Sequence, residues 1–344
     1  MRCYLFPIEP LDRRYTAQWL EWFPPALADQ GFDVVLIHPP DVGAGEVTAG
    51  QFLDPLQTHA YKAAQVRMFV EQVDRRKEGI VVFLDAWHPG VISAAYMRDV
   101  ANLPLRLVGI LHAGCYDPFD LLARSGVGRW AQGFEVSVLR ALDEVTVGSE
   151  WHRVLIERAY GAHGGSMHVH PLPVRTPGVE ARTTRERIVV WPHRDVPEKQ
   201  TATWREAVAR LAPHHTRWRF VETLQETSTK DEYYELLSRA AIAVSAARQE
   251  TFGIAMIEAA QLGCRVIVPQ RLSYPELFPA ALMDRVDTPE DMADAIARCI
   301  EDHEAGIVSF VTLARAVATS ERVRNAERGI ARHWASVAGL HDVA

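Results

Sequence analysis

Short apolar runs alternate with stretches of helical periodicity along almost the whole chain of 344 residues. Because such runs with helices between them are typical of parallel strands joined by crossover helices, the pattern predicts an α/β fold. At roughly 150 residues per domain, the length favours two domains. A hydrophobic content of 48% and a charged content of 24% are ordinary for a globular protein and exclude a disordered chain.

The first half of the chain predicts a Rossmann-like domain over residues 1–172. Its strands are expected at 3–8, 32–38, 80–84, 105–111, 144–147 and 167–170, and its helices at 16–30, 61–77 and 91–100. A further helix is expected before the last of these strands, with Ser149 as its N-cap, because a serine at this position accepts a hydrogen bond from a free backbone amide.

Proline, glycine, threonine and arginine without a sustained period predict an interdomain linker over 173–187. A second Rossmann-like domain then covers 188–320, and a C-terminal helix at 321–344 is expected to pack back on the first domain. The second domain's strands are expected at 187–191, 218–222, 242–245 and 264–268, and its helices at 202–211, 231–239, 254–262 and through most of 289–341. Two such domains are expected to face each other across a cleft, where strand ends present ligands.

Charge and cysteine content narrow the function classes. The formal net charge of −7 excludes a global basic field of the kind that dominates non-specific nucleic-acid binding. The four cysteines show no CxxC spacing and predict reduced core thiols and no metal site. No apolar run approaches the 18 or so residues that span a bilayer, so we expect a cytoplasmic protein without membrane insertion.

Two glutamates, Glu250 and Glu258, lie eight residues apart around the start of a predicted helix. If that helix starts near Thr251, the spacing separates them by about 12 Å along its axis, close to the span of a sugar, a diphosphate and a ribose. Ionised carboxylates only accept hydrogen bonds. We therefore expect Glu258 to accept from ribose hydroxyls and Glu250 from sugar hydroxyls.

Between these glutamates, the backbone amides of Thr251, Phe252, Gly253 and Ile254 predict an anion site at the start of the helix. Gly253 lets the backbone approach a ligand closely. Arg194 and Lys199 follow the first strand of the second domain. Two cations on one loop can neutralise both phosphates of a nucleoside diphosphate and stabilise its charge as it leaves.

The spacing of Glu250 and Glu258 resembles the E-x7-E motif of family 4 and related retaining glycosyltransferases, and Arg194 and Lys199 match the R-x4-K pair that these enzymes use. The resemblance implies the GT-B fold, in which two Rossmann-like domains face each other, and a nucleotide-sugar donor. The sugar is expected to be transferred with retention, by attack of an acceptor hydroxyl on the face from which the diphosphate leaves. No metal or other cofactor is expected, and the sequence shows no credible DxD motif.

A second resemblance involves residues 190–194, Val-Trp-Pro-His-Arg, and 269–277, Pro-Gln-Arg-Leu-Ser-Tyr-Pro-Glu-Leu. Both are similar to sequences of the tRNA-queuosine mannosyltransferase group, and the similarity covers roughly 188–278. Gln270 stands where that group usually has asparagine. This resemblance slightly favours a GDP-sugar over a UDP-sugar, and both remain open.

The acceptor side is expected in the first domain. His112 follows an apolar strand at the position where the related enzymes have a histidine, so the resemblance assigns it a contact with the donor sugar or the reacting groups. Asp85 and His88 after the preceding strand, and Ser149, are further candidates for the acceptor pocket. The turn at 7–14 departs from the resemblance, because it lacks the Gly-Gly pair that many family 4 enzymes carry.

Three function classes stay open on the sequence. The first is a glycosyltransferase that acts on a modified base in tRNA or phage-type DNA, with a phosphate path lined by Arg13, Arg14, Arg175, Arg182, Arg185 and Arg187. The second is a glycosyltransferase that acts on a small molecule, glycan or lipid. The third is a nucleotide-sugar epimerase or a nucleotide-binding regulatory module. The sequence does not indicate an oligomeric state.

Overall fold

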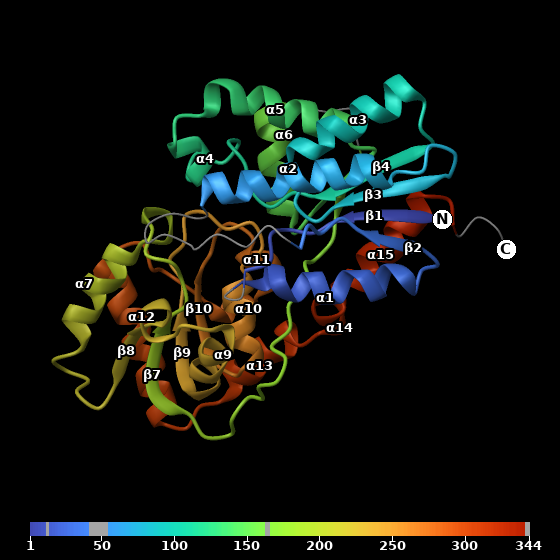
Figure 1. Cartoon of the computed structure of the whole chain (residues 1–344). Helices are drawn as coiled ribbons and strands as arrows, with labels where there is room; N and C mark the ends of the chain where they lie inside the picture. The colour runs from blue at the N-terminus through green and yellow to red at the C-terminus, as the bar shows by residue number, and fades with distance from the viewer. Residues whose placement is uncertain (12–13, 41–53, 162–165, 341–344) are drawn as a thin grey trace. The chain divides into compact units, whose positions relative to one another are not determined.

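The computed structural model describes residues 1–11, 14–40, 54–161 and 166–340. The chain forms two compact units, the first made of Met1–Leu172 with Asn325–Ala344 and the second of Pro173–Arg324. Each unit contains one parallel sheet with helices on both faces (Figure 1), which confirms the predicted α/β class. Within the described residues, no helix combines the length and apolar character needed to cross a membrane.

The first unit is built on a six-stranded sheet in the order β2-β1-β3-β4-β5-β6, with every neighbouring pair parallel. Its strands are β1 Arg2–Phe6, β2 Asp33–Leu36, β3 Gly79–Phe83, β4 Leu105–Ile110, β5 Glu144–Val147 and β6 Ser166–Val169. Its helices are α1 Tyr15–Ala28, α2 Pro55–Gln72, α3 Pro89–Ala101, α4 Leu121–Arg124, α5 Gly128–Ala141, α6 Glu150–Tyr160 and α15 Ala326–Val337.

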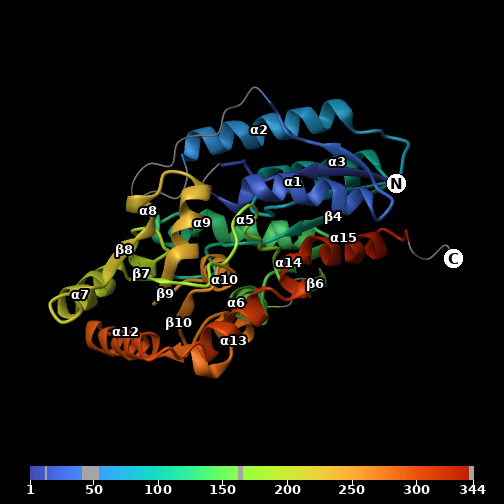
Figure 2. The same cartoon turned by 90° about the horizontal axis from the view of Figure 1, so that it is seen from below.

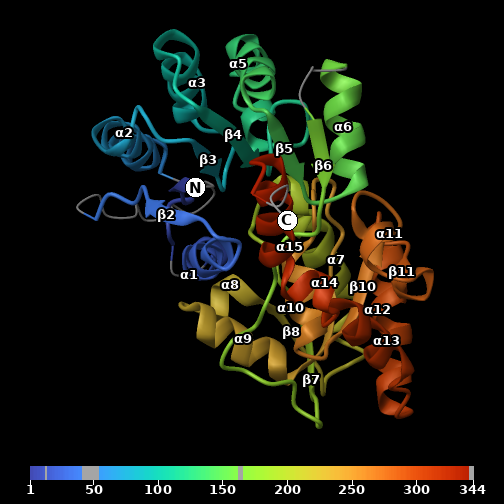
Figure 3. The same cartoon turned by 90° about the vertical axis from the view of Figure 1, so that its right-hand side faces the viewer.

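Helices cover both faces of this sheet, so its central strands are apolar throughout. All five residues of β3 are buried, as expected for a strand with a helical layer on each side. Helices α2, α3, α5 and α6 lie on one face, and α1 and α15 lie together on the other (Figure 3). The Phe23 ring of α1 stacks on the Trp334 ring of α15, with ring centroids 6.1 Å apart, so the end of the chain completes the core of the first unit.

The second unit is built on a five-stranded parallel sheet in the order β11-β10-β9-β7-β8. Its strands are β7 Glu186–Trp191, β8 Arg219–Glu222, β9 Ala240–Val244, β10 Arg265–Pro269 and β11 Met283–Asp284. Its helices are α7 Thr201–Leu211, α8 Thr223–Glu226, α9 Lys230–Arg239, α10 Ile254–Gln261, α11 Tyr274–Leu277, α12 Pro289–Glu304, α13 Ser309–Ala318 and α14 Glu321–Arg324, with short 3-10 turns η1 Pro197–Lys199 and η2 Ala280–Leu282. Helices α7 and α12 pack together (Figure 2).

Most expected elements are present, and two departures have local causes. The pattern predicts a helix at 61–77, whereas α2 starts at Pro55 because Asp54 accepts hydrogen bonds from the amides of Leu56 and Gln57 at 2.9 and 3.1 Å. The sequence does not predict α5, since Gly128 and Gly133 interrupt its pattern and its N-cap makes no side-chain hydrogen bond.

Candidate active site

The carboxyl ends of β7, β9 and β10 meet at one edge of the second sheet, because these three strands are parallel neighbours. The loop after β7 leads into η1 and carries Arg194 and Lys199. The loop after β9 carries Glu250 and leads into α10. A backbone hydrogen bond of 2.8 Å from the Arg248 amide to the Glu198 carbonyl joins the two loops. The topology therefore brings together the cationic loop and the glutamate loop expected from the sequence.

Lys199 forms the main polar link between these loops. Its side chain is only 8% exposed, and its Nζ atom donates to the Gln249 backbone carbonyl at 2.6 Å and to Glu250 Oε2 at 3.1 Å. Arg194 lies five residues earlier on the same loop and is half-buried. One ammonium group thus holds the segment just before the predicted anion site.

The Glu250 carboxylate is held in its ionised form. Burial by itself raises the pKa of a carboxyl group, but the positive charge and hydrogen bond of Lys199, together with the hydrogen bond of the Gly253 backbone amide, hold the pKa of Glu250 below its ordinary value. A carboxylate has about four acceptor positions. Glu250 therefore keeps acceptor capacity beyond its protein partners.

Helix α10 starts at Ile254, with Gly253 as its N-cap, so the 12 Å separation that assumed a helix from Thr251 does not apply. Gly253 adopts a left-handed conformation with φ of 87°, which glycine tolerates without steric cost. Phe252 is buried, so only its backbone can take part in an anion site here. These placements move the helix start three residues closer to Glu258.

Replacing Gly253 by alanine is expected to lower the free energy of unfolding by about 1 to 3 kcal/mol, the cost of an unfavourable backbone conformation. An added Cβ would also lie 3.0 Å from the Tyr274 ring. Urea unfolding followed by circular dichroism measures the effect. Gly133→Ala in α5 is the control, because its Cβ meets nothing within 4 Å and alanine favours a helix. Equal stability of the Gly253 variant and the wild type would contradict the argument.

His193 is a buried neutral group beside the cationic loop. Burial and the positive charges of Lys199 and Arg194 lower the pKa of His193 to about 3. Its ring lies edge-on to Trp191, with centroids 5.1 Å apart. The histidine therefore adds no positive charge to the loop at neutral pH.

Glu258 lies on the buried face of α10 and is paired with a lysine that the sequence analysis does not single out. Lys230 Nζ donates to Glu258 Oε1 at 2.6 Å, and the Tyr234 hydroxyl donates to the same oxygen at 3.0 Å. The exposed fractions of the Lys230 and Glu258 side chains are 14% and 3%. Lys230 also lies over the rings of Tyr233 and Tyr234, 4.7 and 4.8 Å from their centroids.

The 269–277 segment supports the glutamate loop. Arg271 donates to the backbone carbonyls of Ala247 at 3.0 Å and Ala246 at 2.9 Å, which belong to the loop after β9. The Tyr274 hydroxyl bonds Ser245 Oγ at 2.8 Å, and its ring is the surface that faces Gly253. These two residues therefore position the loop that carries Glu250.

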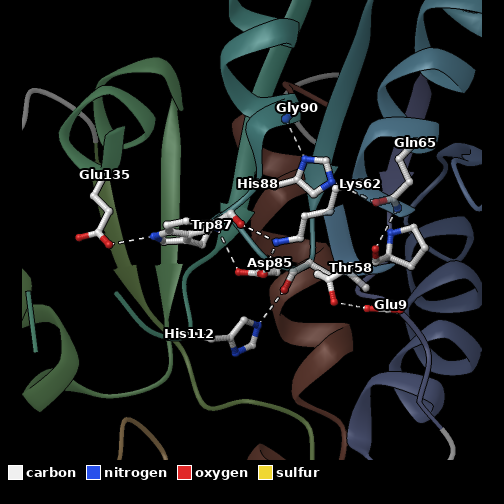
Figure 4. Close-up of polar contacts among 12 residues, drawn as sticks. Glu9, Thr58, Lys62, Gln65, Asp85, Trp87, His88, Gly90, His112 and Glu135 are labelled. Atoms are coloured by element: carbon white, nitrogen blue, oxygen red, sulfur yellow. Dashed lines mark hydrogen bonds and ion pairs between the residues drawn. The ribbon is translucent and has the colours of Figure 1, made fainter. Parts of the chain in front are cut away.

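In the first unit, His112 lies at the carboxyl end of β4 (Figure 4). Its Nε2 atom is 2.7 Å from the Leu84 carbonyl oxygen, which can only accept, so Nε2 carries the proton. Burial lowers the pKa of His112, Lys62 lowers it further, and Asp85 and the bond to Leu84 oppose them. The neutral ring therefore presents Nδ1 as a hydrogen-bond acceptor.

The other first-unit candidates have partners within their own unit. Asp85 pairs with Lys62 at 3.2 Å and accepts from the Trp87 amide at 3.0 Å, with its side chain 21% exposed (Figure 4). His88 is 3% exposed and uses both ring nitrogens, since Nδ1 accepts from the Gly90 amide and Nε2 lies 3.0 Å from Gln65 Oε1. Both ring nitrogens of His88 therefore have partners within the first unit. Ser149 accepts from the His152 amide at 3.1 Å, which confirms the predicted cap of α6.

Four of the arginines considered for a phosphate path have contacts within their own unit. Arg182 pairs with Glu235, Arg185 donates to the Ser238 carbonyl, and Arg187 lies 3.6 Å from Glu304. Arg175 donates to the Arg324 carbonyl. Arg13 lies outside the described residues. In the part of the chain that the structure describes, no group of three or more histidine, cysteine or acidic side chains has the arrangement of a metal site.

Comparison with known proteins identifies the second unit. Residues 187–302 match the family model described as "Glycosyl transferases group 1". The second unit contains a glycosyltransferase domain. This domain extends from β7 to α12 and includes Arg194, Lys199, Glu250 and Glu258. The match and the fold together indicate a glycosyltransferase enzyme.

Solved structures show the fold of the whole chain. Sucrose-phosphate synthase from Thermosynechococcus elongatus matches with a TM-score of 0.72 and 15% identity, covering 98% of this chain and 99% of that one. Anabaena HepE, solved in complex with UDP and glucose, matches with a TM-score of 0.64 and 13% identity, covering 99% of both chains. The two parallel-sheet units of this glycosyltransferase therefore have the GT-B fold, which confirms the fold expected from the sequence.

A curated relative matches over a short segment. The tRNA-queuosine alpha-mannosyltransferase of Drosophila melanogaster is 46% identical over 50 residues, which is 14% of this chain and 13% of that protein. The match spans far less than two thirds of the relative. It supports the resemblance to the queuosine group over a segment shorter than the 188–278 expected from the sequence.

Proposed function

We propose that the chain is a retaining glycosyltransferase that moves a sugar from a nucleotide-sugar donor to an acceptor hydroxyl. The observation that carries this proposal is the link from Lys199 to Gln249 and Glu250, which brings the cationic loop to the start of α10. Arg194 on the same loop supplies a second positive charge. A diphosphate held there is contacted by cations on one side and by the amides of Thr251, Phe252 and Ile254 on the other, since the Gly253 amide bonds Glu250.

The proposed reaction separates charge between sugar and diphosphate. The bond between the anomeric carbon and the diphosphate oxygen breaks, and its electron pair leaves with the diphosphate. The acceptor oxygen forms the new bond on the same face, and its proton passes to a phosphate oxygen. Arg194 and Lys199 stabilise the negative charge that grows on the leaving group, which favours the transition state over the bound donor.

Three side chains that accept hydrogen bonds then orient the bound nucleotide sugar. Glu250, ionised and with free lone pairs, accepts from sugar hydroxyls, and Glu258 accepts from the ribose. His112 accepts at Nδ1 from a sugar or acceptor hydroxyl, because its Nε2 proton is committed to the Leu84 carbonyl. Asp85, which is partly exposed beside Lys62, is a further candidate to contact the substrate that receives the sugar.

Thermal shift against UDP, GDP and their sugars tests the donor. A ligand that binds only the native state raises the free energy of unfolding by mass action, by about 2.7 kcal/mol at 100 times its Kd, and the melting temperature rises with it. We expect one of the two nucleotides to stabilise the protein more than the other, and the complex of Anabaena HepE with UDP and glucose favours UDP. If neither nucleotide nor sugar shifts the melting temperature at millimolar concentration, the donor site is refuted.

Product analysis then separates the function classes. Transfer is supported when the sugar appears on an added alcohol and nucleoside diphosphate forms in equal amount. An epimer formed without an acceptor indicates a nucleotide-sugar epimerase, and binding without turnover indicates a regulatory module. Retention is read from the anomeric configuration of the product by NMR.

The acceptor has two candidate classes, each with its own observation. The solved structures that resemble the whole chain include sucrose-phosphate synthase and an alpha,alpha-trehalose-phosphate synthase from Burkholderia vietnamiensis, which favours a sugar or sugar phosphate. The Drosophila relative is named for tRNA-queuosine, which favours a modified base. Binding to tRNA that falls steeply between 50 and 200 mM salt supports the second class. Binding that does not change with salt removes it.

A further inference from the structure

A cavity lies in the second unit, away from the candidate active site. It has a volume of about 430 Å³, within the range of small-molecule sites. Ala241 and Ile242, at the start of β9, and Arg265, the first residue of β10, lie in its wall. Lys199 and Glu250 follow the opposite ends of the strands. The cavity therefore opens at the amino edge of the sheet and is not part of the proposed donor site.

The cavity has a cationic rim with no acidic residue in its lining. Four arginines line it, together with Thr183 and Thr184. The four are Arg182, Arg185, Arg265 and Arg315. Among the residues that the structure describes, Glu235 pairs with Arg182 and Asp302 pairs with Arg265. Neither acidic residue lines the cavity.

Positive charge at the rim is only partly compensated. Arg185 has backbone carbonyls as its partners, including Leu262 at 2.5 Å. Burial lowers the pKa of Arg185, and the nearby charges of Arg315 and Arg182 lower it further against the opposing effect of Cys264. Arg315 is exposed, and its guanidinium forms no ion pair with any described residue. An added anion would therefore find unused hydrogen-bond donors here.

Apart from His303, the rest of the lining is apolar. Ile242 and Cys299 are buried, whereas Ile307 and Val308 are 43% and 66% exposed. Exposed aliphatic side chains next to guanidinium groups suit a ligand with a charged end and a hydrocarbon body. An ion such as inorganic phosphate would leave these side chains in contact with water.

We propose that this cavity binds a small phosphate ester whose body is apolar. The guanidinium group of Arg315 binds the phosphate oxygens in the paired geometry that arginine favours, and the other lining arginines add to the positive potential. Ile307 and Val308 cover the hydrocarbon part. The site is independent of the proposed transfer reaction, and a protein without transferase activity would still bind the ester.

Isothermal titration at fixed ionic strength with phenyl phosphate tests the proposal. We expect saturable binding that is at least tenfold tighter than that of inorganic phosphate or benzyl alcohol, since each of these has only one half of the ligand. Arg315→Gln and, separately, Val308→Asp are expected to weaken binding at least tenfold. Arg322→Gln is the matched control, because Arg322 is exposed in the same unit and does not line the cavity.

The donor site is the main competitor for a phosphate ester, and Lys199→Gln distinguishes the two sites. The proposal requires that Lys199→Gln keeps phenyl phosphate binding while Arg315→Gln loses it. The reverse result would place the ester in the donor site and overturn the proposal. Absence of saturable binding, or equal affinity of the wild type and Arg315→Gln with unchanged circular dichroism, would overturn it as well.

Discussion

Replacing Lys199 by glutamine is expected to lower kcat/KM for sugar transfer by about 10²- to 10³-fold, as seen when one preorganised electrostatic contact to a transition state is removed. The ammonium group of Lys199 lies at the join of the two loops, 3.1 Å from Glu250 and 2.6 Å from the Gln249 carbonyl. Its loss removes a positive charge from the proposed diphosphate site. It also breaks the contacts that hold the loop carrying Gln249 and Glu250. Initial rates with saturating donor measure kcat, and initial rates with limiting donor measure kcat/KM.

Lys77→Gln is the control for this substitution, since Lys77 is an exposed lysine of the first unit, 3.7 Å from Asp74. It is expected to leave the rates unchanged. If Lys199→Gln kept at least a third of the wild-type kcat/KM, the assignment of the diphosphate site to this loop would be wrong.

The same substitution is expected to change the pH dependence of stability. In the wild type the folded-state pKa of Glu250 is lowered, so its stabilising contribution is present above the ordinary pKa of a glutamate and is lost as the pH falls through the folded value. Without Lys199, burial raises the pKa, so the Glu250 contribution weakens or reverses sign. Urea unfolding between pH 3.5 and 7 measures the slopes, and equal slopes in both proteins would contradict the assigned cause.

The fold was readable from the sequence because local pattern and tertiary environment agree. Strands such as β3 and β9 are buried along their whole length, so they appear as uninterrupted apolar runs. Helix α5 was not readable for the opposite reason. Its glycines lower the helical signal, and its stability comes from packing against α3, a contact that no local pattern records.

The candidate site was readable only where chain order carries the information. Residues that follow β7 and β9 could be placed at one edge, because parallel neighbouring strands end on the same side. The pairing of Lys230 with Glu258 could not be predicted in this way. The two residues lie on different helices, α9 and α10, and only the packing of these helices brings them together. The visible signal at Lys230 was the capping box of α9, with Thr229 and Glu232, which indicates only the start of a helix.

The motif at 269–277 also shows that a sequence pattern alone does not tell what its residues contact. Its resemblance to the queuosine group draws attention to Tyr274 and Arg271 as functional residues. In the structure both bond the loop after β9 through Ser245 and the Ala246 and Ala247 carbonyls. A spacing pattern reports that residues matter to a site, and only the contacts tell a supporting residue from one that faces the ligand.

Replacing Glu258 by alanine is expected to have two separable effects. The first is a loss of about 3 to 5 kcal/mol of unfolding free energy, because it leaves the largely buried Lys230 ammonium without its counter-charge. The second is loss of the nucleotide-dependent thermal shift, because Glu258 is the proposed acceptor for the ribose hydroxyls. Urea unfolding measures the first effect, and thermal shift with the stabilising nucleotide measures the second.

The double variant Lys230→Met with Glu258→Gln distinguishes these effects, since it removes both charges at once. Replacing a buried ion pair by neutral groups of similar size is often nearly neutral for stability, whereas removing one partner is costly. We therefore expect the double variant to recover most of the stability, while Lys230→Met alone stays destabilised. Ribose recognition needs the acceptor-only carboxylate, so the thermal shift should stay reduced in the double variant. If it returned to the wild-type size, Glu258 would have a structural role alone, and the ribose contact would have to be assigned elsewhere.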